Sequence, residues 1–180
     1  DGGVRPVPYA DEPGRPQIRD LFAGLCKSGD CEAVVEGGST IALKRKDGSI
    51  TLEPGGQFEL SANAFVLDTD CKSDLDQHLR ELLPLADRLS IAFIGVGFRP
   101  LGTWDDVPWM PKGRYKVMRE YLPTRGKLGV EMMKRTATVQ ANLDYVSEAD
   151  AMAKLRLGVG LGPLVTALYA ASPLVDGKPT

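Results

Sequence analysis

Two stretches of the sequence alternate polar and apolar residues, a pattern that can line one face of a sheet with reactive groups. On both sides of Pro54-Gly55-Gly56, polar residues including Glu53, Gln57 and Glu59 occupy odd positions and apolar residues occupy even positions. If the Pro-Gly-Gly segment stays extended, these three side chains share one face. Their oxygens suit Mg²⁺, which takes one or two carboxylates together with phosphate oxygens and water.

The second alternating stretch covers residues 136–145, for which we expect a long strand. Thr138, Gln140 and Asn142 lie at its even positions, between apolar neighbours. The simplest alternative for both stretches is an antiparallel sheet with its outer face in water. Solvated strand faces favour Thr, Lys and Arg, whereas these two present Glu, Gln and Asn, which favours a binding surface.

Cationic residues lie between the two stretches. Lys112, Arg114 and Tyr115 follow Pro111, and Arg135 immediately precedes the second stretch. The guanidinium of Arg binds carboxylate or phosphate through two parallel hydrogen bonds, and Lys supplies a point charge. An exposed helix with ordinary surface charge explains the same spacing equally well.

Hydrophobic periodicity predicts the elements that position these residues. Asp47-Gly48 is typical of a hairpin turn, Pro84 should kink or end its helix, and Ser147 with Asp150 resembles a capping box. Interspersed helices and strands favour one α+β domain over residues 1–180. The helices are expected at 15–27, 70–89, 112–122 and from 147, and the strands at 32–35, 39–45, from 50, 91–98 and 136–145.

The last helix needs a decision between membrane and core. Residues 157–175 carry no charge and are nearly long enough to span a bilayer. Three glycines, Pro163 and Pro173 interrupt this stretch, and its flanks are polar. We therefore expect a buried core helix in a soluble protein.

Composition excludes several classes of function. Lys and Arg number 22 against 24 Asp and Glu, so charge supports neither a nucleic-acid nor a membrane partner. A single histidine, His78, leaves a Ser–His–Asp triad or a His-rich metal site without residues. We expect the three cysteines to be thiols of a cytoplasmic protein. The chain starts without Met and begins and ends in turn residues, so we expect a piece of a longer chain of undetermined oligomeric state.

Five segments carry a resemblance to a known family. They are Ile50–Ser61, Gly95–Pro100, Met110–Pro123, Met132–Tyr145 and Ser172–Pro179. Together, and in this order, they resemble the plant and proteobacterial glutamate–cysteine ligases. The resemblance implies a glutamine synthetase-like antiparallel sheet and an enzyme of glutathione biosynthesis. It also implies a reaction in which ATP phosphorylates the γ-carboxylate of glutamate and the amine of cysteine then displaces phosphate.

The resemblance also assigns roles, residue by residue. Mg²⁺ would be the cofactor and ATP a co-substrate, and such chemistry depends on metal ions and positioned cations more than on a nucleophilic side chain. Glu53 and Glu59 would bind the metal. Lys112, Arg114 and Arg135 would be catalytic, holding anionic groups. The residues expected to contact glutamate, cysteine or ATP are Gln57, Tyr115, Thr138, Gln140 and Asn142.

Departures from the family pattern leave alternatives open. Family members carry further glutamates on a strand upstream of Asp1, and many have Cys where this chain has Ala137. We therefore expect residues 1–180 alone to be inactive. The alternatives are a related carboxylate–amine ligase with another amine acceptor, and a ligand-binding fragment without catalysis.

Overall fold

The computed structural model describes residues 5–27 and 31–180. The chain divides into two compact units, which are described separately. One consists of Asp1–Ile94 with Thr103–Arg135, and the other of Gly95–Gly102 with Thr136–Thr180. Among the described residues, a four-stranded antiparallel sheet and five α-helices confirm the expected α+β class.

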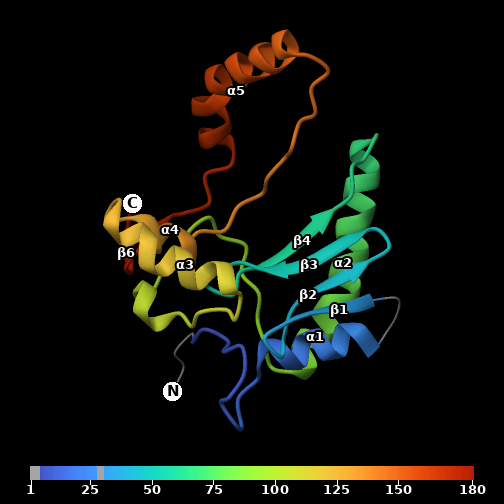
Figure 1. The fold of residues 1–180 in the computed structure, drawn as a ribbon, viewed down its shortest axis with the longest axis vertical. Helices are drawn as coiled ribbons and strands as arrows, with labels where there is room; N and C mark the ends of the chain where they lie inside the picture. The colour runs from blue at the N-terminus through green and yellow to red at the C-terminus, as the bar shows by residue number, and fades with distance from the viewer. Residues whose placement is uncertain (1–4, 28–30) are drawn as a thin grey trace. The chain divides into compact units, whose positions relative to one another are not determined.

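The first unit is built on that sheet. Its strands are joined in chain order, each antiparallel to the next. Helices α1 (Ile18–Lys27) and α2 (Asp68–Arg88) cover one of its faces (Figure 1). The strands are β1 (Cys31–Glu36), β2 (Ser39–Arg45), β3 (Gly48–Leu52) and β4 (Phe58–Ala62).

Tight turns set the register of the first two hairpins. Gly37 and Gly38 join β1 to β2 with positive φ angles of 56° and 81°, a conformation that glycine adopts without steric cost. The expected Asp47-Gly48 turn is confirmed, since Arg45 pairs with Gly48 across β2 and β3. These hairpins follow from local turn chemistry.

The core lies between the sheet and its two helices. Ile50 and Leu52 of β3 are fully buried and pack with Leu43 of β2 and with apolar residues of α1 and α2. Full burial of one such side chain stabilises the fold by about 1.5–3 kcal/mol. The cluster residues that α1 and α2 contribute are Ile18, Leu21, Phe22, Leu25, Leu82 and Leu85.

Of the two outcomes expected at Pro84, a kink or an end, helix α2 does not show the end. It continues to Arg88. Leu82 and Leu85 are buried on either side of the proline, and Ala86 is buried as well. Packing of both halves against the core therefore holds the helix across the backbone hydrogen bond that proline lacks.

Four short elements complete the first unit. A reciprocal capping box between Thr103 and Asp106 opens the first of them. Helix α3 begins one residue later than expected. The elements are the 3₁₀ helix η1 (Trp104–Asp106), α3 (Gly113–Tyr121), the 3₁₀ helix η2 (Leu122–Thr124) and α4 (Gly129–Arg135).

In the second unit, the long strand expected at 136–145 is absent. Thr136 forms an isolated bridge with Phe98, and Ala137 donates a backbone hydrogen bond to Gly97. Beyond this point the segment is irregular, as are residues 91–96 of the strand expected at 91–98. Alternation alone does not make a strand, because the backbone also needs a paired neighbour.

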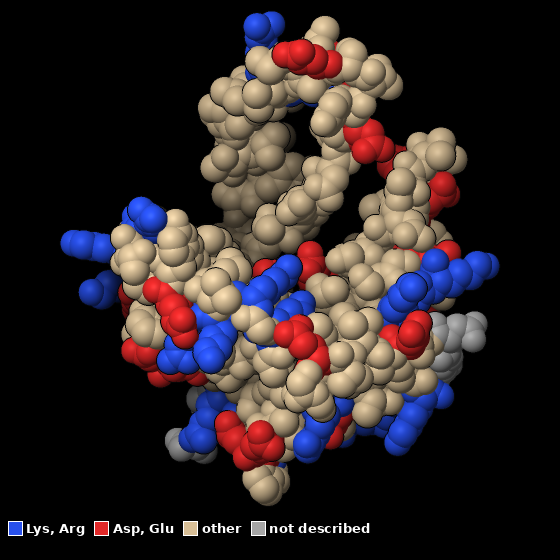
Figure 2. All heavy atoms as spheres, viewed as in Figure 1, with Lys and Arg blue, Asp and Glu red and all other residues tan. Residues whose placement is uncertain are grey.

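Helix α5 (Glu148–Leu168) belongs to the second unit, which ends in the short strands β5 (Leu174–Val175) and β6 (Lys178–Pro179). The predicted cap is confirmed, since Ser147 Oγ accepts a hydrogen bond from the Asp150 amide. The expectation of a buried helix is wrong, since no residue of α5 is buried. By length and composition alone α5 could cross a membrane, and Figure 2 shows that little charge lies along it.

The expectation of three thiols is also wrong. Cys26 at the end of α1 and Cys31 at the start of β1 form a disulfide, with their Cα atoms 5.3 Å apart. Such a spacing lies within the usual range for a bridge. Cys71 is a free and exposed thiol.

Candidate functional site

The candidate site begins at the turn between β3 and β4. Pro54-Gly55-Gly56 does not stay extended: the Gly56 amide donates to Glu53 O, and Gly56 has a φ of 83°. The expectation of one continuous strand is therefore wrong. In the resulting hairpin, Thr51 pairs with Glu59 and the Glu53 amide donates to Gln57 O at 3.0 Å.

This hairpin still gathers the predicted carboxylates. Paired residues of an antiparallel ladder lie on the same face, and so do residues two apart on one strand. Thr51 Oγ1 donates to Glu59 Oε2 at 2.5 Å, which fixes Thr51 and Glu59 on one face. Glu53, two residues after Thr51, continues that face. The two glutamates thus share a face through a hairpin and not through the predicted single strand, and their role as metal ligands stays a prediction; Thr51 was not among the predicted site residues.

Gln57 serves as a tether. Its Oε1 accepts from the Gly55 amide at 2.9 Å, and its Nε2 donates to Met133 O on α4 at 3.0 Å. Both ends of the amide therefore hold the turn against α4. Its predicted contact with substrate stays a prediction.

Two residues from the start of α3 converge on the end of β3. Lys112 Nζ and Tyr115 Oη both donate to Leu52 O, at 2.7 Å and 2.6 Å. Burial lowers the pKa of Lys112, and so does Arg114, while nearby Glu53 and Glu59 oppose that change. Burial raises the pKa of Tyr115. The partly desolvated ammonium of Lys112 therefore lies at the carbonyl of Leu52, the residue that precedes Glu53.

Arg114 completes this group. Its Nη2 lies 3.6 Å from Glu53 Oε1 and donates to Tyr115 Oη at 3.1 Å. That hydrogen bond is the main reason that the pKa of Arg114 is raised. The guanidinium side chain is 63% exposed, so its remaining donors can reach a ligand carboxylate or phosphate.

Arg135, the third predicted cation, lies at the end of α4. It is buried, and its Nη1 lies 3.0 Å from Glu131 Oε2 one turn earlier on the same helix. This ion pair joins two consecutive turns of α4, and the predicted catalytic role of Arg135 stays a prediction.

Three predicted contact residues belong to the second unit. All three are exposed, and the Gln140 amide donates to Asn142 Oδ1 at 2.8 Å. Thr138 Oγ1 donates to the neighbouring carbonyl of Val139. Their roles remain predictions.

Sequence reasoning missed Lys134, a buried cation on α4. Lys134 is 3% exposed, and its Nζ lies 5.4 Å from the ring centroid of Trp104 and 4.6 Å from that of Trp109. Burial lowers its pKa to about 8. Cation–π attraction accounts for the arrangement. No local sequence signal pairs Lys134 with these rings.

The carboxylates fit part of a magnesium site. Within residues 5–27 and 31–180, no group of three or more His, Cys, Asp or Glu side chains gathers around a common point. Glu53 and Glu59 share a face and retain exposed oxygens. Two carboxylates suffice for Mg²⁺ when phosphate oxygens and water complete its shell.

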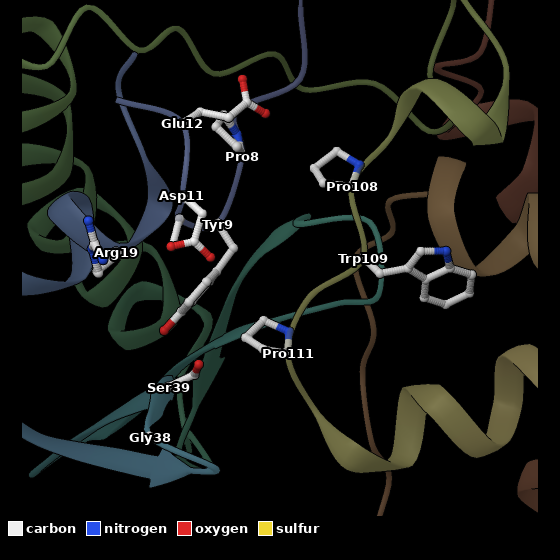
Figure 3. Close-up of a pocket in the computed structure, with 11 residues that line it drawn as sticks. Pro8, Tyr9, Asp11, Glu12, Arg19, Gly38, Ser39, Pro108, Trp109 and Pro111 are labelled. Atoms are coloured by element: carbon white, nitrogen blue, oxygen red, sulfur yellow. The ribbon is translucent and has the colours of Figure 1, made fainter. Parts of the chain in front are cut away.

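A separate open pocket of about 470 Å³ lies at the tip of the β1–β2 hairpin. In Figure 3, Pro108 and Pro111 face a wall that includes Tyr9 and Arg19, while the indole of Trp109 turns away. None of the predicted site residues lines this pocket. Its lining consists of Pro8, Tyr9, Ala10, Asp11, Glu12, Arg19, Gly38, Ser39, Pro108, Trp109 and Pro111.

Comparison with known proteins now adds to this geometry. The chain is 46% identical over 179 residues to the chloroplastic glutamate–cysteine ligase of Medicago truncatula, covering 99% of this chain and 34% of that protein. It is 46% identical over 177 residues to the chloroplastic enzyme of Arabidopsis thaliana, covering 98% and 33%. For glutamate–cysteine ligase A of Oryza sativa subsp. japonica, also chloroplastic, the values are 45% over 177 residues, 98% and 35%. The chain thus spans about a third of the length of these relatives.

The relatives' names correct one expectation. Each is a chloroplastic enzyme, which contradicts the cytoplasmic location inferred from the sequence. The family match itself extends over residues 3–180 and bears the description Glutamate-cysteine ligase family 2 (GCS2). Since that match takes in both the β3–β4 hairpin and the start of α3, the chain that holds this group of carboxylates and cations belongs to the glutamate–cysteine ligase family 2.

Proposed function

We propose that the protein containing this chain joins the γ-carboxylate of L-glutamate to the amine of L-cysteine, using ATP and Mg²⁺ and giving γ-glutamylcysteine. Family membership and the names of the relatives support this proposal. The observation that carries it is the convergence of Lys112 and Arg114 on the end of β3, beside Glu53. The relatives' names also support a plastid location.

The proposed chemistry has two displacements. A γ-carboxylate oxygen of glutamate attacks the γ-phosphorus of ATP, and ADP leaves. The cysteine nitrogen then attacks the acyl carbon of the resulting acyl phosphate, phosphate leaves, and the amine gives up one proton. Neither displacement requires a nucleophilic side chain, because positioning and charge stabilisation provide most of the acceleration.

The residues of the first unit would divide this work. Arg114 has exposed donors for a carboxylate or phosphate, and Lys112 adds a point charge close by. Glu53 and Glu59 would hold Mg²⁺, which when bound neutralises charge on the phosphates. Tyr115 supports both cations, since its ring lies under Lys112 and Arg114 at 5.4 Å and 5.0 Å.

Amine-dependent ADP release tests the proposal. The protein expressed from its complete reading frame is mixed with ATP, Mg²⁺ and glutamate, and a panel of amines is supplied one at a time. Cysteine should give the highest rate and a product with the mass of γ-glutamylcysteine. A preference for another amine would favour the related ligase, and ADP release that no amine stimulates would contradict the proposal. Residues 1–180 alone should show no such activity.

A further inference from the structure

The tip of the β1–β2 hairpin makes a contact that the proposed chemistry does not explain. Glu36, the last residue of β1, accepts a hydrogen bond from the Gly113 amide through Oε1 at 2.7 Å. Gly113 is the first residue of α3. A Cβ atom at position 113 would lie 2.6 Å from the same oxygen, so a larger residue there would displace the Glu36 carboxylate.

Glu36 takes the role of a helix cap. The first amides of a helix lack partners within the helix, and the preceding residue usually satisfies one of them through its side chain. Lys112 precedes α3 and cannot make such a bond, because its ammonium group has no acceptor, and it donates to Leu52 O instead. A carboxylate from another strand fills the gap, and its charge also interacts favourably with the helix dipole.

The hairpin tip is anchored on a second side. Tyr9 Oη donates to Thr40 O at 3.0 Å, four residues beyond Glu36. Gly37 and Gly38 make the intervening turn as tight as a hairpin allows. The tip is therefore held in place independently of α3 and can act as a support for it.

The helix that Glu36 caps begins among the cations of the candidate site. Arg114 and Tyr115 lie in the first turn of α3, and Lys112 directly precedes it. A shift at the start of α3 would move all three relative to Leu52 and Glu53. Catalysis by positioning is sensitive to displacements of about 1 Å.

We propose that Glu36 is a positioning residue: by capping α3 it fixes Lys112 and Arg114 for the anionic groups of the substrates. This inference rests on the proposed function, since it assigns a support to the same site. Glu36 also has a second, weaker effect that favours anion binding, because its negative charge favours the charged form of Lys112.

Two variants separate these effects, and a third serves as control. Glu36→Ala removes both the acceptor and the charge, whereas Glu36→Gln retains an acceptor oxygen without the charge. Glu32→Gln removes an exposed carboxylate from the same strand without touching α3. The three are compared in the protein expressed from its complete reading frame, through kcat and KM for ATP and glutamate and through amide exchange of peptides covering residues 112–118.

Glu36→Ala should lower kcat/KM by about fivefold, the scale of a lost helix cap. Most of the change should fall on KM for glutamate or ATP, because anion positioning is what weakens. Amides at the start of α3 should exchange faster in the same variant. Glu36→Gln should restore slow exchange and most of kcat/KM, and Glu32→Gln should match the wild type in both.

Several results would overturn the inference. One is a Glu36→Ala protein whose kinetics match those of Glu32→Gln, even with faster exchange. Another is a Glu36→Gln protein that loses as much as Glu36→Ala. If Glu36→Ala fails to fold, the Gln variant decides by the same two measurements. If the wild type shows no amine-dependent ADP release, the proposed function fails, and the exchange data separately test whether Glu36 caps α3.

Discussion

Replacing Gly55 by alanine tests whether α4 positions the turn that carries Glu53. A Cβ atom at position 55 would lie 2.9 Å from the Lys134 Cα and closer still to the Lys134 carbonyl oxygen. Both are backbone atoms, which cannot rotate away as a side chain can. The turn or the end of α4 must therefore move.

The expected loss is that of overpacking at a tight backbone contact. Extra methyl or methylene groups in well-packed regions cost about 1–3 kcal/mol. A loss of that size should lower the Tm by roughly 2–4 °C per kcal/mol for a domain of about this length. Because Gln57 links the same turn to Met133 through a hydrogen bond, the movement should also disturb Glu53, and kcat/KM should fall.

Thermal or urea unfolding of Gly55→Ala provides the assay, with Gly126→Ala as the matched control. No atom lies within 4 Å of a Cβ built at Gly126. That substitution should be neutral or slightly stabilising, since alanine restricts the unfolded chain. Equal stability and activity in the two variants would refute the packing of α4 on the turn.

Three further predictions concern the two glutamates, His78 and Lys134. Glu53→Gln or Glu59→Gln should lower turnover by about a hundredfold with the fold intact, and near-wild-type turnover in both would refute the metal assignment. Burial lowers the pKa of His78 from 6.5. As pH drops through 6.5, the unfolded chain therefore binds a proton at this histidine before the folded protein does, and stability should fall. A His78→Leu variant whose stability depends on pH in the same way would contradict this. Both tryptophans of the chain flank Lys134, so their fluorescence should titrate with a midpoint near pH 8 and stability should rise from there towards pH 10.5, where the unfolded lysine also loses its proton. Lys134→Met should abolish that titration, and a wild-type midpoint above pH 10 would be inconsistent with the burial of Lys134.

Local pattern correctly located most of the secondary structure of the first unit. Apolar spacing placed α1 and α2, and the Asp47-Gly48 signal placed the β2–β3 turn. Such features depend on residues a few positions apart, which period and turn chemistry report directly. The same reasoning identified the cap at Ser147.

Long-range contacts were beyond that reasoning. Residues 136–145 alternate as a strand does, yet among the described residues no neighbouring strand pairs with them beyond Thr136. The exposure of α5 was also missed, because an apolar sequence requires a covering surface but does not say which segment supplies it. The Cys26–Cys31 bridge depended on how α1 and β1 approach each other.

The candidate site shows the division most clearly. The sequence by itself determined its chemistry: carboxylates at Glu53 and Glu59, and cations at Lys112 and Arg114. Only the tertiary structure decided how they meet. The chain reverses at Pro54–Gly56, and Lys112 and Tyr115 donate hydrogen bonds to Leu52 O, which is 60 and 63 residues away in the sequence. It also brought Glu36 to Gly113 across 77 residues. Residue types and periods report what a segment can do, whereas the path of the folded chain decides which distant segments act together.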